Sequence, residues 1–97
     1  MFQISWTKKA EAQLRNTLLY WNEHNKSTSY SKKLAKEVNK KQDFLINNPN
    51  SGTPVNYNSV FKIQILKVFS LIYKMEKQNI TIIAFWDNRR NPENLEL

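Results

Sequence analysis

The sequence has no cysteine and only one histidine, His24. Without cysteine the chain forms no disulfide, thiolate nucleophile or cysteine-based zinc site, and one histidine is too few for a typical zinc cluster. We therefore expect no bound metal, no other cofactor and no redox role. His24 lies in a polar segment and is expected to be a solvated loop residue without a catalytic role.

Long apolar segments are also missing. The longest uninterrupted apolar run covers only residues 82–86, whereas a membrane helix needs about twenty residues. The N-terminus becomes charged within a few residues and lacks the long apolar core of a signal peptide. These features predict a cytoplasmic protein with no membrane partner.

Aromatic residues and positive charges, by contrast, are plentiful. Three Trp, four Tyr and five Phe in a chain that is 40% hydrophobic favour a packed core over disorder. The length fits one domain, which we expect to span residues 1–97. The net charge is +7, and such an excess of Lys and Arg attracts polyanions at long range. Composition thus gives a first indication of nucleic-acid contact.

Two periodicities divide the chain into helices and strands. Apolar residues at three-to-four spacing predict helices over 7–23 and 29–47, the first capped by Thr7. A break with Pro49, Gly52 and Pro54 follows the second helix. Alternation of apolar and polar residues predicts strands over 2–6, 59–67, 69–75 and 80–86.

The predicted order is therefore β-α-α-β-β-β. Two helices joined by a short polar turn form an antiparallel hairpin. We expect this hairpin to cover one face of a mostly antiparallel four-stranded sheet, which is an α+β fold. The segment 80–86 is apolar on both faces, as expected of a central strand that is covered on both sides.

The end of the last predicted strand carries the most informative residues. Asp87, Arg89 and Arg90 come directly after an aromatic strand, and Pro92 stops further strand pairing. The planar guanidinium group of arginine suits phosphate oxygens. The alternative is structural: Asp87 pairs locally with an arginine, and the two arginines form a solvated exit from the sheet.

Further basic residues lie in or beside the neighbouring strands. Lys62 is on the opposite strand face from Phe61 and Ile63, and Lys67 is the last residue of the same predicted strand. The functional interpretation joins Lys62 and Lys67 with the two C-terminal arginines in one nucleic-acid-binding patch. The alternative is that exposed lysines on a strand only discourage edge pairing. Tyr57, in a polar loop, is the aromatic that we expect to be exposed and able to stack on a base.

Order and motif together resemble the RelE/ParE superfamily of type II toxin-antitoxin toxins. The resemblance covers nearly the whole chain, and its order within this length is more specific than any single piece. Its segments are Trp6-Thr7, Tyr20-Trp21-Asn22, Ser29-Tyr30-Ser31, the Asn48-Pro49 to Gly52 break, the strand 69–73, and the run 85–92.

The resemblance implies an antitoxin partner and one of two activities. RelE-like members cut messenger RNA in the ribosomal decoding site with basic residues on the sheet face, whereas ParE-like members poison DNA gyrase. By position, Lys62 matches a basic residue on the strand after the loop, and Arg89 lies near the one that ends the last strand. The antitoxin is expected to supply an acidic or amphipathic segment, giving a hetero-oligomer.

RNA cleavage requires activation of the 2′-hydroxyl, stabilisation of the phosphorane and protonation of the leaving oxygen. The charged candidates are Lys62, Lys67, Arg89 and Arg90. Since no histidine lies in the C-terminal half, Tyr57 and Asp87 are the candidate acid and base. The favoured hypothesis is a metal-independent, ribosome-dependent mRNA endoribonuclease. A gyrase poison is the second hypothesis, and a non-catalytic binding module of the same fold is the third.

Overall fold

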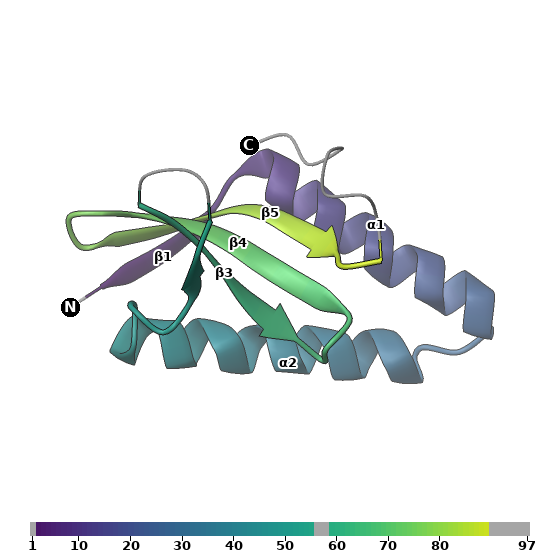
Figure 1. Ribbon diagram of the computed structural model, residues 1–97. Coiled ribbons are helices and arrows are strands. Elements are labelled where there is room, and N and C mark those ends of the chain that lie inside the picture. Colours follow the sequence, from purple (N-terminus) through teal and green to yellow (C-terminus); the bar gives the residue numbers. More distant parts are fainter. Residues whose placement is uncertain (1, 56–58, 90–97) are drawn as a thin grey trace.

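The computed structural model describes residues 2–55 and 59–89, and Figure 1 shows its elements in chain order. The two helices form a hairpin, and the five strands form one sheet. The elements are β1 (Gln3–Trp6), α1 (Lys8–Asn25), α2 (Ser29–Asn47), β2 (Thr53–Pro54), β3 (Val60–Ile65), β4 (Phe69–Glu76) and β5 (Asn79–Asp87). Across the sheet, the strands follow the order β1-β5-β4-β3-β2.

The α+β class and the predicted helical hairpin are confirmed, and the sheet has one strand more than predicted. The segment Thr53–Pro54 pairs with β3 through Thr53 opposite Lys62 and Pro54 opposite Phe61. Two residues are too short to show an alternating pattern, and proline is tolerated at the edge of a sheet because no neighbour needs its N–H. β1 pairs in parallel with β5, while the other strand pairs are antiparallel.

Local hydrogen bonds fix both ends of α1. Thr7 Oγ1 accepts from the backbone N–H of Ala10 at 3.1 Å, as the predicted cap requires. At the other end Lys26 adopts a left-handed conformation, with a φ of 50°. Its N–H reaches back to the carbonyl oxygens of Asn22 and Glu23. The hairpin is then tied by the buried Ser31 of α2, whose hydroxyl donates to the Asn22 side chain.

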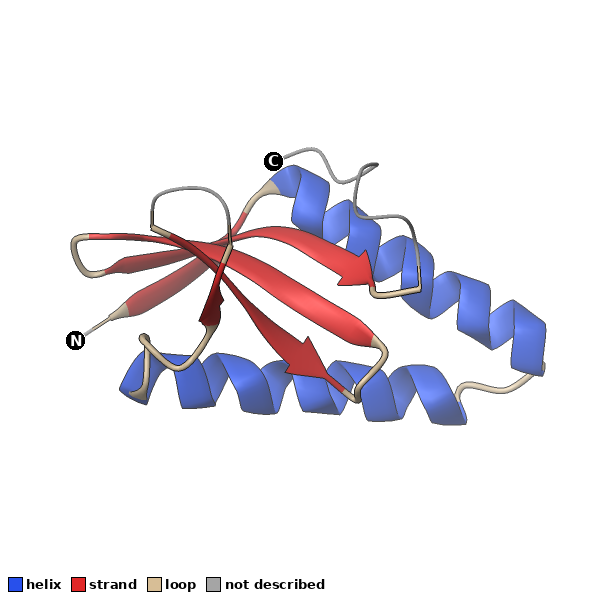
Figure 2. Cartoon of the chain, in the orientation of Figure 1, coloured by secondary structure: helices blue, strands red, loops and turns tan. Residues whose placement is uncertain are grey.

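The main core lies between the helices and one face of the sheet. The helices, drawn in blue in Figure 2, run in opposite directions and join at a short turn. Their buried side chains pack against alternating residues of β4 and β5, which makes this the helix side of the sheet. The core residues include Ala10, Leu34, Val38, Leu45, Phe69, Leu71, Tyr73, Ile80, Ile82 and Phe85.

A second, smaller apolar cluster lies on the other side of the sheet, which we call the open face. Val60, Ile72, Ala84 and Trp86 form it. The prediction that residues 80–86 are apolar on both faces is therefore confirmed. Within residues 2–55 and 59–89, neither helix combines the length and the apolar character that crossing a membrane demands.

The turn between β3 and β4 holds two successive residues in left-handed conformations. The φ angles of Leu66 and Lys67 are 53° and 65°. For residues with a Cβ atom this conformation costs about 1–2 kcal/mol each, whereas glycine adopts it freely. The turn that carries Lys67 is consequently a strained part of the chain.

Replacing Lys67 by glycine should therefore stabilise the protein. We expect the free energy of unfolding to rise by about 0.5–1 kcal/mol, since the relieved strain exceeds the extra entropy that glycine loses on folding. Urea unfolding followed by circular dichroism measures it. Lys67→Ala is the matched control, because it removes the same charge and keeps the Cβ atom. A Lys67→Gly protein no more stable than Lys67→Ala would contradict the assigned turn conformation.

Candidate functional site

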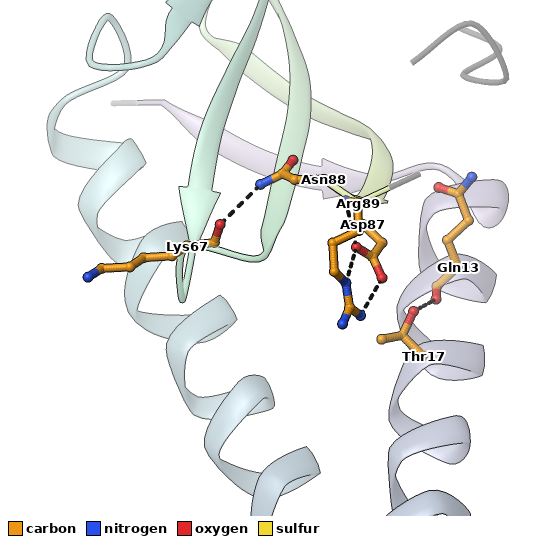
Figure 3. Close-up of polar contacts among 6 residues, drawn as sticks. All are labelled: Gln13, Thr17, Lys67, Asp87, Asn88 and Arg89. Carbon is orange, nitrogen blue, oxygen red and sulfur yellow. Dashed lines mark hydrogen bonds and ion pairs between the residues drawn. The ribbon is translucent and has the colours of Figure 1, made fainter. Parts of the chain in front are cut away.

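The end of β5 is fastened to the β3–β4 turn. The backbone N–H of Asn88 donates to the carbonyl oxygen of Val68 at 2.8 Å, and the Ser70 hydroxyl donates to Asn88 Oδ1 at 2.7 Å. Asn88 Nδ2 also approaches the carbonyl oxygen of Lys67, at 3.5 Å, as Figure 3 shows. These contacts hold the backbone at the point where the candidate residues Asp87 and Arg89 leave the sheet.

Asp87 and Arg89 form a two-pronged ion pair. Arg89 Nε donates to Asp87 Oδ1 at 3.0 Å, and Arg89 Nη2 donates to Asp87 Oδ2 at 2.7 Å (Figure 3). The local pairing that the sequence offered as the structural alternative is thus confirmed. Hydrogen bonding to Asp87, and then its charge, raise the pKa of Arg89 above its ordinary value. The pair orients the guanidinium group, and because it is exposed it adds little to stability.

Arg89 lies against α1, beside a groove between this helix and β5. Its guanidinium carbon is 5.7 Å from the centre of the Trp21 ring, within range of a cation–π contact. The groove has a volume of about 360 Å³. It is lined by Gln13, Asn16, Thr17, Tyr20 and Trp21 of α1 and by Phe85, Asp87 and Arg89. We call it the α1–β5 groove.

Lys62 lies elsewhere, exposed on the open face of the sheet. It pairs with Ile72, a member of the open-face cluster. Asp87 instead pairs with Phe69, which belongs to the core on the helix side. The side chains of Lys62 and Asp87 therefore lie on opposite sides of the sheet, and Arg89 accompanies Asp87. The functional roles predicted for these residues stay predictions.

Lys67, another basic candidate, lies in the β3–β4 turn and is not part of the Asp87–Arg89 ion pair. Figure 3 shows the Lys67 side chain pointing away from that pair. Tyr57 and Arg90, both predicted as site residues, lie outside the described residues.

The open face offers little acid or base chemistry within the described part of the chain. Gln64 lies two residues from Lys62 on β3, and Ser70 of β4 is the cross-strand partner of Gln64. Glu76 is the carboxylate there, and its side chain pairs with Lys74 at 2.7 Å. The hydrogen bond from Lys74, together with its charge, lowers the pKa of Glu76 below its ordinary value. Glu76 is thus ionised at neutral pH and is a weak base, whereas a general acid or base works best with a pKa near neutrality.

The fold and these positions can now be compared with known proteins. A family model described as "ParE toxin of type II toxin-antitoxin system, parDE" matches residues 4–92, which is most of the chain. This chain belongs to the ParE toxin family.

A solved structure supports the same fold for this ParE-family chain. A chain from the "Chromosomal ParDE TA system from P. aeruginosa" is similar with a TM-score of 0.73 and 19% sequence identity. The match covers 90% of the present chain and 96% of the other. No curated protein sequence matches. The family-model match therefore confirms the predicted RelE/ParE relationship and assigns the chain to the ParE family.

Sequence analysis missed an aromatic cluster at the end of α1 in this ParE-family chain. His24 was predicted to lie in the turn, but α1 continues to Asn25 and His24 occupies its last turn. There its ring stacks on that of Tyr20, with centroids 5.5 Å apart and planes 11° apart. The signal was present in the spacing, because residues four apart on a helix are neighbours. Ending the helix at residue 23 removed His24 from that comparison.

Proposed function

We propose that this ParE-family toxin acts in the cytoplasm by binding and poisoning DNA gyrase rather than by cutting messenger RNA, as a single toxin domain over residues 1–97. The observation that carries the proposal is the separation of the charged candidates. Lys62 lies on the open face, while Arg89 lies across the sheet in the α1–β5 groove.

Cleavage of RNA needs its catalytic groups together. A base, a charge that stabilises the phosphorane and an acid must all reach one scissile phosphate. Among the described residues on the open face, Glu76 is the carboxylate, and it is ionised and already paired with Lys74. A toxin that works by occupying a surface of its target requires no such constellation, so the geometry suits a gyrase-binding mode better.

The ribosome-dependent endoribonuclease is the second candidate. It is favoured by the exposure of Lys62 on the open face and by the absence of an ion-pair partner for it among the described residues. The expected contributions of Tyr57 and Arg90 to this activity stay predictions, as does the contribution of Arg89.

Induction of the toxin in cells separates the two candidates. The measurement combines DNA supercoiling, trapped double-strand breaks and mapped transcript 5′ ends shortly after induction. We expect double-strand breaks together with intact messages, and no loss of growth arrest in a Lys62→Ala variant. Codon-phased cuts in translated messages would contradict the gyrase proposal. If Lys62→Ala or Arg89→Ala then slowed cleavage by about 10²–10³, the typical effect of losing a preorganised charge, the endoribonuclease would take its place.

We also propose where the antitoxin binds. An apolar groove of about 430 Å³ runs between α1 and α2, lined mainly by Trp6, Leu14, Leu18, Leu19, Ala35 and Val38. Leu19 is 54% exposed there. An amphipathic helix places its apolar face in such a groove, and the net charge of +7 favours an acidic polar face on the partner. The resulting assembly would be a toxin–antitoxin hetero-oligomer.

A further inference from the structure

The aromatic cluster that borders the α1–β5 groove is built from Tyr20, Trp21, His24 and Tyr30. Trp21 lies edge-on to Tyr20 and to His24, with ring centroids 5.2 and 5.3 Å away, and its centroid is 5.1 Å from that of Tyr30. Tyr20 and His24 are stacked on each other, and Tyr20 is 56% exposed. Trp21 therefore packs edge-on against both rings of the stacked pair, while the Tyr20 ring stays accessible to a ligand.

Arg89 supplies an oriented cation beside this platform. Asp87 engages Nε and Nη2 of its guanidinium group. Nη1 donates to no residue in the described part of the chain, and the Arg89 side chain is 60% exposed. The bidentate pair and the Trp21 ring hold the guanidinium plane in place. Nη1 is therefore oriented to donate a hydrogen bond to an anion.

The groove also contains amide groups that are suited to a planar polar ligand. Gln13 Oε1 accepts from the backbone N–H of Phe85 at 2.9 Å, which leaves the Gln13 NH₂ group as a donor. Asn16 lines the same groove and is exposed, and its side chain makes no hydrogen bond with another described residue. An amide presents a donor and an acceptor together, the combination that the edge of a nucleobase pairs with.

We propose that the α1–β5 groove binds an unpaired nucleotide of a single-stranded nucleic acid. A base stacks on the accessible Tyr20 ring, Gln13 and Asn16 contact its edge, and Arg89 Nη1 contacts an adjacent phosphate. Aromatic stacking beside a basic group is the usual means of binding single strands without sequence preference. The excess positive charge of the chain attracts the polyanion to the site.

A single strand fits these groups better than a duplex. The faces of duplex bases are covered by their stacked neighbours, and a base must leave the stack before an aromatic side chain reaches its face. DNA and RNA single strands share the base and phosphate chemistry, so the experiment compares both. The inference is independent of the proposed gyrase target, because binding is measured on the purified toxin without gyrase or ribosomes.

The test is fluorescence anisotropy with labelled oligothymidylate, oligouridylate and a duplex DNA of the same length. We expect either single strand to bind more tightly than the duplex, and the tighter of the two identifies the natural strand type. Tyr20→Ala should weaken binding about tenfold or more, while Tyr20→Phe retains it because the ring is kept. Arg89→Ala should weaken binding and reduce the salt slope by about 0.7, the value for one phosphate contact on a single strand.

The matched controls are two other exposed apolar side chains. Leu19 adjoins Tyr20 on α1 and is 54% exposed, and Phe44 on α2 is 43% exposed. Leu19→Ala and Phe44→Ala should bind like the unmodified toxin. Circular dichroism should show folded protein for every variant, since the substituted side chains are exposed. Equal or tighter duplex binding would overturn the proposal, and so would loss of binding in Lys62→Ala but not in Tyr20→Ala, which would place the ligand on the open face.

Discussion

Replacing Gly52 by alanine should lower the free energy of unfolding by about 2–4 kcal/mol. A Cβ atom there would lie 2.3 Å from the hydroxyl oxygen of Tyr73 and 3.0 Å from the backbone oxygen of Lys62. Tyr73 is fully buried, and its hydroxyl accepts from the Gly52 N–H and donates to the carbonyl oxygen of Pro49, both at 3.0 Å. Because the Tyr73 ring is also stacked on Phe61, we expect the added methyl group to push the loop away and break these bonds.

Thermal unfolding measures this effect, and the expected drop in the melting temperature is roughly 10 °C or more for a chain of this size. Ser51→Ala is the matched control, since Ser51 is the adjacent residue and is exposed. Its substitution should leave the melting temperature almost unchanged. Equal stability of the Gly52→Ala and Ser51→Ala proteins would show that the loop does not pack on Tyr73 as described.

Periodic segments were the part of the fold that sequence could predict. The helix over 29–47 was correct at both ends, because Leu34, Val38 and Leu45 mark one face and polar or proline-containing segments border it. The two-sided apolar character of β5 also followed from its sequence alone. In such an element the side chains that face the core recur at the period of the helix or strand, so the apolar residues repeat along the sequence.

Pairing between distant segments was the part that sequence could not predict. β2 exists because Thr53 and Pro54 meet β3 across the loop, and two residues carry no period of their own. Gly52 was recognised as a break in the chain, but its close contact with Tyr73 is a tertiary feature. Neither property can be inferred from neighbours in the sequence.

The candidate site illustrates the same limit at the level of single residues. The sequence identified Lys62 as a basic residue within a strand and Arg89 as one that follows a strand end, and alternation placed Lys62 on one face. The side on which Arg89 lies depends on its ion pair with Asp87 and its contact with Trp21. Those contacts join β5 to α1, and strand alternation cannot predict them because Arg89 follows the end of the strand.

Phe69→Ala is the substitution that we expect to destabilise the fold most without touching an exposed candidate residue. Phe69 is fully buried, and its ring stacks on Phe85 with centroids 5.2 Å apart. Deleting a buried phenyl ring costs about 3–5 kcal/mol, through lost burial and the cavity that remains. Because domains of this kind have only about 5–15 kcal/mol in total, the variant should lose a large fraction of its stability, as urea unfolding would show.

Phe44→Ala is the control, because it removes the same phenyl ring from an exposed position outside the core. Phe44 is 43% exposed, and the Lys41 ammonium nitrogen lies 5.4 Å from the centre of its ring. Phe44→Ala should therefore lower the free energy of unfolding by about 1 kcal/mol or less. In cells, Phe69→Ala should weaken growth arrest by lowering the amount of folded toxin, and Phe44→Ala should preserve it. An antitoxin that binds only the folded toxin shifts the folding equilibrium, so coexpression should raise the level of Phe69→Ala protein. Wild-type stability of Phe69→Ala would contradict the core assignment, and with it the packing of Phe69 on Phe85, which lines the α1–β5 groove.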